Sequence, residues 1–72
     1  MKVRIELNTM TDVTDFVSIV SACPGQVFLS DDKHQQICAK SQLGAILAKM
    51  EWEEIYCVSD EDISGSIIRF IV

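Results

Sequence analysis

The first twenty residues change from one hydrophobic period to another, and this change limits the folds open to the chain. Apolar and polar side chains alternate over residues 1–7, which is typical of a strand with one buried face. Apolar residues then recur at the spacing of one helix face, at Val13, Phe16, Val17 and Val20. The chain therefore begins with a strand and a helix that share one core. Thr11 or Asp12 is suited to cap the helix, and Pro24-Gly25 ends it near residue 23.

Three further strands and a second helix are expected. Residues 26–30 and 34–39 form strands, and the polar turn between them indicates a hairpin. Ser41 caps the second helix, and residues 54–59 form the fourth strand. The apolar residues of the second helix again follow helical spacing, at Leu43, Ile46, Leu47 and Met50.

The last segment has a less regular pattern. The acidic residues 60–62 suit the first turn of a helix, where carboxylates complement the helix dipole. Three isoleucines would then face the sheet: Ile63, Ile67 and Ile71. Gly65 and the β-branched residues disfavour a helix, so a strand is the alternative to a short final helix.

The order of these elements is β-α-β-β-α-β-α. It predicts an α+β open-faced sandwich, with a four-stranded antiparallel sheet and helices on one face. The 72 residues suffice for one small core, so we expect a single domain over residues 1–72.

Charge and cysteine content exclude several classes of function. Eleven acidic and six basic residues give a net charge of −5, which argues against nucleic acid or an anionic membrane as partner. No stretch approaches the ~20 apolar residues of a membrane span, and the alternating start is unlike a signal peptide, so we expect a cytoplasmic protein. The three cysteines form no CxxC pair and indicate reduced, largely packed thiols. We therefore expect no metal and no cofactor.

The two helix starts differ in their suitability for a phosphate. Free N–H groups and a partial positive charge at a helix start attract anions. Asp12 and Asp15 already supply negative charge at the first helix and would repel a phosphate. The second helix begins with Lys40 and Ser41 and has no acid in its opening turn, so a phosphate on Ser41 would gain the dipole and a nearby cation. A plain helix cap is the alternative role for Ser41.

The element order and the segment KSQLGAIL resemble the HPr family of phosphocarriers of the sugar phosphotransferase system. In that family a KSxxGxxxL-like segment begins the second helix, and its serine is the regulatory phosphorylation site in Gram-positive members. Lys40, Ser41 and Gly44 match this pattern, and Ala48 stands where leucine is usual. The resemblance spans nearly the whole chain.

The histidine motif of that family is missing. A GxHARPA-like segment places the phosphoryl-accepting histidine at the start of the first helix. Counted back from Ser41 with the family spacing, the histidine position falls on Met10, give or take one residue. The glycine, arginine and proline positions then fall on Asn8, Asp12 and Val13. A thioether cannot replace imidazole as a phosphoryl relay, and Asp12 reverses the charge that would hold the phosphate.

The resemblance implies a non-catalytic domain that binds proteins of phosphotransferase or carbon-regulation type and is switched by phosphorylation of Ser41. It implies a docking surface at the start of the first helix and on the second helix, with Lys40, Leu43 and Ile46 as contacts. Helical spacing favours a core position for at least one of Leu43 and Ile46.

Two alternatives remain open. One is a small ferredoxin-like ligand-binding regulatory domain, whose sheet places the first strand beside the third, whereas the HPr-like sheet places it beside the fourth. The other is a carrier that uses an atypical residue, for which His34 at the hairpin tip is the only histidine. An exposed polar turn residue is the plainer interpretation of His34.

Overall fold

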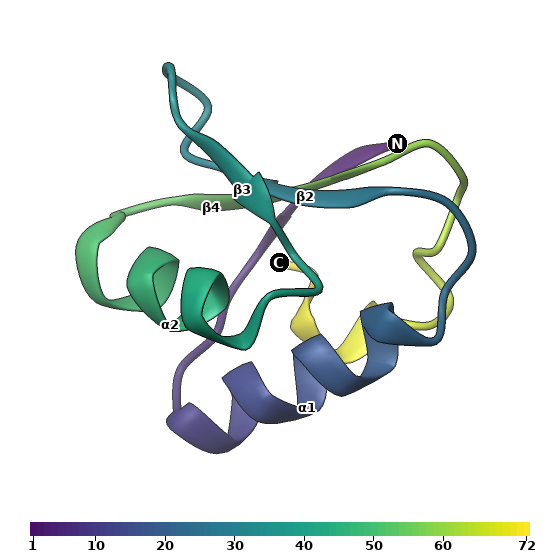
Figure 1. Ribbon diagram of the computed structural model, residues 1–72, viewed down its shortest axis with the longest axis horizontal. Helices are drawn as coiled ribbons and strands as arrows, with labels where there is room; N and C mark the ends of the chain where they lie inside the picture. Colours follow the sequence, from purple (N-terminus) through teal and green to yellow (C-terminus); the bar gives the residue numbers. More distant parts are fainter.

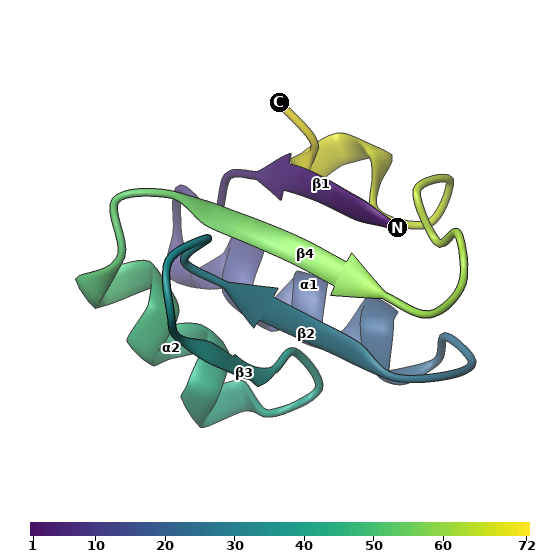
Figure 2. The same ribbon diagram turned by 90° about the horizontal axis from the view of Figure 1, so that it is seen from above.

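The computed structural model, which describes residues 1–72, contains one antiparallel sheet of four strands. The strands are β1 (Lys2–Ile5), β2 (Val27–Ser30), β3 (Gln36–Cys38) and β4 (Ile55–Ser59). Their order across the sheet is β1-β4-β2-β3, so the first strand lies beside the last one (Figure 2). The predicted hairpin is confirmed, because β2 and β3 are antiparallel neighbours.

Two helices, α1 (Met10–Ser21) and α2 (Gln42–Glu51), cover one face of this sheet (Figures 1 and 2). They run antiparallel, since Gln42 Nε2 donates to Thr14 Oγ1 at 3.2 Å while Lys49 Nζ donates to the carbonyl of Asn8 at 3.1 Å. The predicted α+β class, with an open antiparallel sheet and helices on one side, is confirmed.

The core is formed by α1, the inner face of the sheet and the C-terminal segment. All four apolar positions predicted for α1 are buried: Val13, Phe16, Val17 and Val20. Leu29 and Cys57, opposed in β2 and β4, are fully buried as well. Alternation along β1 places Ile5 and Leu7 in the core, although the strand itself ends at Ile5.

The start of α1 differs from the prediction. The helix is capped by Thr9, whose Oγ1 accepts the N–H of Asp12 at 3.0 Å. Asp12 returns a bond, because its Oδ2 accepts the N–H of Asn8 at 3.0 Å. Thr9 and Asp12 are spaced as in a capping box, in which each of the two side chains accepts a hydrogen bond from a backbone N–H at the other's end of the turn. The predicted cap at Thr11 or Asp12 is therefore wrong by two to three residues.

The orientation of α2 also departs from its apolar pattern. Its sheet-facing side carries small residues, with Ala45 and Ala48 fully buried. The helix approaches β3 so closely that a Cβ on Gly44 would lie 3.3 Å from Ile37 Cδ1 and 3.5 Å from the carbonyl oxygen of Cys38. The larger residues Leu43, Leu47 and Met50, which share the predicted apolar stripe, point to solvent instead.

The C-terminal segment contains no α-helix. Its only helical element is the 3₁₀ turn η1 (Ile68–Phe70), so the expected helix from residue 60 is wrong. The polar residues before it form local bonds: Asp62 Oδ1 accepts from the N–H and the hydroxyl of Ser64, and the Ser59 hydroxyl donates to the carbonyl of Glu61. Such side-chain bonds compete with the helix and favour a loop.

This segment closes the free edge of β1. Ile71 forms an isolated antiparallel bridge with Ile5, and the N–H of Val72 donates to the carbonyl of Arg4 at 3.1 Å. Ile63 and Ile67 are buried as predicted. Phe70 meets Phe16 edge to face, with ring centroids 5.4 Å apart, and so ties the tail to α1.

Candidate functional site

Ser41 is the N-cap of α2, as predicted. Its Oγ accepts the N–H of Gly44 at 3.1 Å, and the residue is exposed to solvent. The first turn of α2 contains no acidic residue, so the partial positive charge of the helix start is not compensated there.

Lys40 lies next to Ser41 in sequence, but its ammonium group is bound elsewhere. Its Nζ donates to the carbonyls of Cys23 and Gly25, each at 3.0 Å, beyond the end of α1. The backbone of Gly25 has a positive φ of 75°, which allows the chain to turn at this point. The nearby cation expected for a phosphate on Ser41 is therefore already engaged by backbone oxygens.

An exposed apolar surface follows Ser41 along α2. The exposed fractions are 77% for Leu43, 47% for Leu47 and 74% for Met50. Met10, at the start of α1, is 50% exposed. These four residues are called the α2 face below. Ile46 is half-buried and packs against the core, so of the two predicted apolar contact residues Leu43 is exposed and Ile46 is partly in the core.

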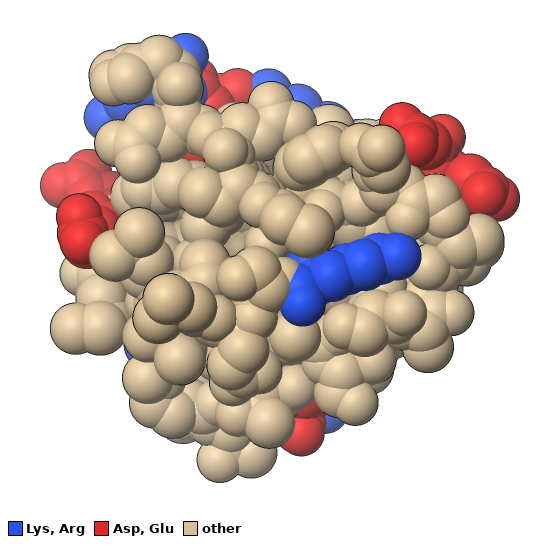
Figure 3. Space-filling view, in the orientation of Figure 1, with Lys and Arg blue, Asp and Glu red and all other residues tan.

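Met10 belongs to this surface because of the way the two helices pair. Thr14 and Asn8 each accept a hydrogen bond from α2, and Met10 lies between them in sequence. Met10 is therefore alongside the middle of α2. Figure 3 shows the side of the molecule on which α2 and β3 lie in front: one basic side chain lies across its middle, and the other charged groups lie at its periphery.

Leu47 and Met50 were not singled out as surface residues by the sequence pattern. A signal was present in the small residues Gly44, Ala45 and Ala48, which form a second face on the same helix. Small residues permit close approach to a sheet, so this face competes with the larger apolar side chains for the inward position. In α1 no such face exists, and its apolar stripe is buried.

The start of α1 carries paired carboxylates and no imidazole. Met10, which the resemblance aligns with the histidine, is the first residue of the helix. Arg69 from η1 pairs with Asp12 at 3.5 Å and with Asp15 at 3.3 Å. The negative charge at this helix start is thus partly neutralised from within the chain.

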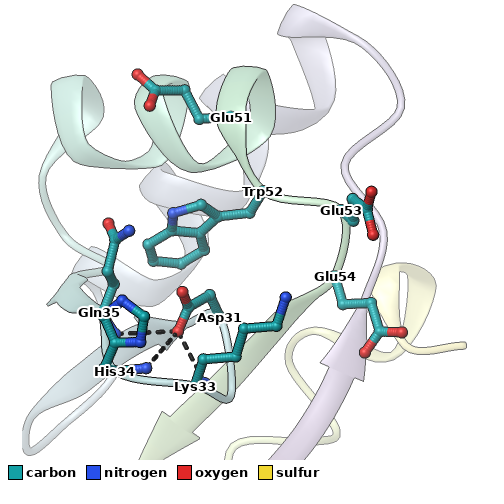
Figure 4. Close-up of a pocket in the computed structure, with 8 residues that line it drawn as sticks. All are labelled: Asp31, Lys33, His34, Gln35, Glu51, Trp52, Glu53 and Glu54. Atoms are coloured by element: carbon teal, nitrogen blue, oxygen red, sulfur yellow. Dashed lines mark hydrogen bonds between the residues drawn. The ribbon is translucent and has the colours of Figure 1, made fainter.

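A polar cavity of about 440 Å³ lies between the hairpin tip and the loop that joins α2 to β4. Figure 4 shows the Trp52 ring between Gln35 and Asp31 on one side and the acidic loop residues on the other. His34 lines this cavity together with four carboxylates, those of Asp31, Glu51, Glu53 and Glu54. Such surroundings are unfavourable for a dianionic phosphoryl group, because Lys33 is the only basic residue in the lining.

Asp31 organises the tip of this hairpin. Its Oδ1 accepts the backbone N–H of Gln35 at 3.0 Å, of Lys33 at 2.9 Å and of His34 at 3.1 Å (Figure 4). The bond from Gln35, with those from Lys33 and His34, lowers the pKa of Asp31 below its usual value. The turn also holds Asp32 at a positive φ of 62°, which aspartate tolerates.

The cysteines differ in exposure. Cys57 is fully buried, and burial raises the pKa of its thiol to about 11. Cys23 is half-buried, whereas Cys38 on β3 is exposed, so the expectation of largely packed thiols is wrong for Cys38. No three His, Cys, Asp or Glu side chains are grouped so that they would hold a metal ion. None of the helices has the length and apolar character that crossing a membrane requires.

Comparison with protein-family models, with curated proteins and with solved structures found no match to this chain.

Proposed function

We propose that this chain is an HPr-like domain that has lost histidine phosphoryl transfer and acts by binding a protein of phosphotransferase or carbon-regulation type. The observation that carries the proposal is the α2 face, which exposes large apolar side chains directly after Ser41. The family resemblance assigns its docking surface to the same two helix segments.

The strand order supports the HPr-like interpretation over the ferredoxin-like one. The structure pairs β1 with β4 over four residues, and no pairing joins β1 to β3. A ferredoxin-like sheet would place its first strand beside the third. The resemblance implies an antiparallel sheet with the first strand beside the fourth and helices on one face, and the observed order β1-β4-β2-β3 is compatible with it (Figure 2).

The residues at the expected phosphoryl site support the loss of carrier activity. Met10 offers a thioether, which neither accepts a phosphoryl group nor transfers a proton. Asp12 and Asp15 surround the same helix start with carboxylates, and their one cationic partner, Arg69, is shared between them. The alternative carrier His34 lines a cavity dominated by carboxylates, so the geometry gives it no support.

The exposure of the α2 face supports a binding role. Burying one such side chain gains roughly 1.5–3 kcal/mol relative to leaving it in water, so exposed leucines and methionines in a row are costly unless a partner covers them. The centres of protein interfaces are depleted of charge and enriched in methionine, as this surface is.

Docking is tested by mapping amide chemical shifts of the chain during titration with the first enzyme of the phosphotransferase system. We expect shifts on α2 and at Met10, and loss of binding in Leu43→Asp. Ile68→Asp is the matched control, because Ile68 is 67% exposed but lies in η1, at the β1 edge of the sheet. Shifts that persist in Leu43→Asp would contradict docking through the α2 face.

Ser41 is proposed as the switch of this surface. A phosphate there would gain the partial positive charge at the start of α2, although Lys40 is engaged elsewhere, and would add about two negative charges beside Leu43. An HPr-type kinase is expected to add one phosphate to the wild type. This incorporation is expected to be lost in Ser41→Ala and kept in Ser18→Ala, a serine variant on α1. Ser41→Ala costs about 1 kcal/mol of helix capping, so its fold is verified by circular dichroism. Incorporation that survives Ser41→Ala would contradict this assignment.

A further inference from the structure

We infer that, in the absence of another partner, the α2 face is covered by a second copy of this chain in an antiparallel helix pair. The inference goes beyond the proposed function, because it concerns what the chain does with this surface by itself. It rests on the spacing of the exposed residues, on the charges at the two ends of α2 and on the area available.

The exposed residues of α2 form a self-complementary seam. Leu43, Leu47 and Met50 stand at i, i+4 and i+7, which is the spacing of the contact line between two packed helices. If two copies of α2 meet antiparallel, with Leu47 at the two-fold axis, Leu43 of one copy lies opposite Met50 of the other. Every large exposed side chain of the helix then has an apolar neighbour in the second copy.

The charges favour the antiparallel over the parallel arrangement. The start of α2 has a partial positive charge and no acidic residue in its first turn. The opposite end and the loop after it carry Glu51, Glu53 and Glu54, all exposed. An antiparallel pair places each acidic end beside the helix start of the other copy, whereas a parallel pair would place the six glutamates together.

The ammonium groups of two lysines near the α2 face are held by carbonyls of their own copy. The ammonium group of Lys49 in the last turn of α2 is turned towards the carbonyl of Asn8, and that of Lys40 binds carbonyls beyond the end of α1. A chain with a net charge of −5 repels its own copy over most orientations. The acidic groups lie at the periphery of the side seen in Figure 3, so two copies can approach there with less repulsion.

The area indicates a weak dimer. Burial of the four partly exposed apolar side chains would remove on the order of 400 Å² of accessible surface from each copy. This is about half of the ~800 Å² that each partner contributes to a standard interface. Polar residues around the seam supply part of the remainder. We therefore expect a dissociation constant on the order of 100 µM, which a partner that binds the same face more tightly would overcome.

Sedimentation velocity of the full chain between 10 µM and 1 mM tests the inference. The wild type is expected to change from monomer to dimer across this range, and Leu47→Glu to remain monomeric at 1 mM. Ile68→Glu, a change of the same kind at an exposed residue in η1, is expected to dimerise like the wild type. Circular dichroism verifies that each variant is folded.

A cross-link tests the position of the axis without weakening the fold. In a Cys38→Ala background, Leu47→Cys places one thiol of each copy at the two-fold axis. Diamide accepts the two electrons and two protons released as the disulfide forms, and a covalent dimer is expected to accumulate at least ten times faster than for Ile68→Cys in the same background. Equal rates for the two cysteines would overturn the inference.

The remaining outcomes are equally decisive. A wild type that stays monomeric at 1 mM, or a dimer that survives Leu47→Glu, overturns the helix pair. Neither result bears on the proposed function, which is judged by docking of the first enzyme and by phosphoryl transfer. Conversely, if the chain dimerises but binds no partner protein, the helix pair would hold and the proposed function would not.

Discussion

Asp31 shows how one side chain can organise a turn through backbone donors. It accepts three N–H groups of the hairpin tip, and these bonds lower the pKa of its carboxyl group. A carboxyl group whose pKa is depressed in the fold stabilises it above the unfolded pKa of 3.8. This contribution is lost as pH falls through the lower pKa of the folded state.

An acid titration followed by amide chemical shifts measures this effect at the residue itself. The amide shifts of Lys33, His34 and Gln35 are expected to change together, with a common midpoint below pH 3.8, because their shared acceptor becomes protonated. In Asp31→Asn, which does not titrate, the common transition is expected to disappear. A midpoint at or above pH 3.8 in the wild type would contradict the proposed organisation of the tip.

At the residue scale, the sequence predicted one helix cap and missed the other. Ser41 has no competing hydroxyl or acid immediately around it, so its assignment was unambiguous. Before α1, Thr9, Thr11 and Asp12 all have suitable side chains. Which of them caps the helix depends on where β1 ends, and the local sequence does not determine that residue.

At the element scale, the two helices have similar apolar patterns but opposite relations to the core. Phe16 of α1 is fully buried, whereas Leu43 of α2 is mostly exposed. Phe16→Ala is expected to cost about 3–5 kcal/mol of unfolding free energy, through lost burial, a cavity and the lost contact with Phe70. Leu43→Ala is expected to change it by less than about 0.5 kcal/mol. Urea denaturation of both variants measures the difference, and a loss of 2 kcal/mol or more in Leu43→Ala would show that α2 does not present this residue to solvent.

The orientation of α2 was not predictable from periodicity alone. The large residues Leu43 and Leu47 and the small ones Ala45 and Ala48 each define a face of the helix. Which face turns inward depends on the space left between α1 and β3. A Cβ on Gly44 would lie only 3.3 Å from Ile37 Cδ1, which shows that this space is narrow. Tertiary packing therefore overrides the larger hydrophobic stripe.

The C-terminal segment was also set by tertiary context. Its isoleucines were predicted to be buried, and Ile63 and Ile67 are, but the backbone reaches those positions through a loop and one 3₁₀ turn. The deciding contacts are long-range, namely Phe70 against Phe16 and the bridge between Ile71 and Ile5. No local sequence pattern in the segment predicts these long-range contacts.

At the scale of the whole molecule, the sequence predicted the order of the first six elements, the antiparallel sheet and the position of both helices on one face. These features follow from hydrophobic periods and turn signals that recur along the chain. The candidate site was predicted in part, since Ser41 is the exposed cap and Leu43 is exposed, whereas the engagement of Lys40 at the end of α1 depends on contacts between distant segments.

The central claim is the proposed absence of histidine phosphoryl transfer in this chain. The start of α1, which the HPr resemblance aligns with the phosphoryl-accepting histidine, carries Met10, Asp12 and Asp15, and the apolar α2 face lies beside it. Transfer of a phosphoryl group from phosphoenolpyruvate through the first enzyme of the system tests this claim most directly. Intact-mass measurement of this chain, with a phosphorylatable HPr in the same reaction as internal control, gives the result. We predict one added phosphoryl group on the control and none on this chain. Stoichiometric, acid-labile phosphorylation of this chain would contradict the account.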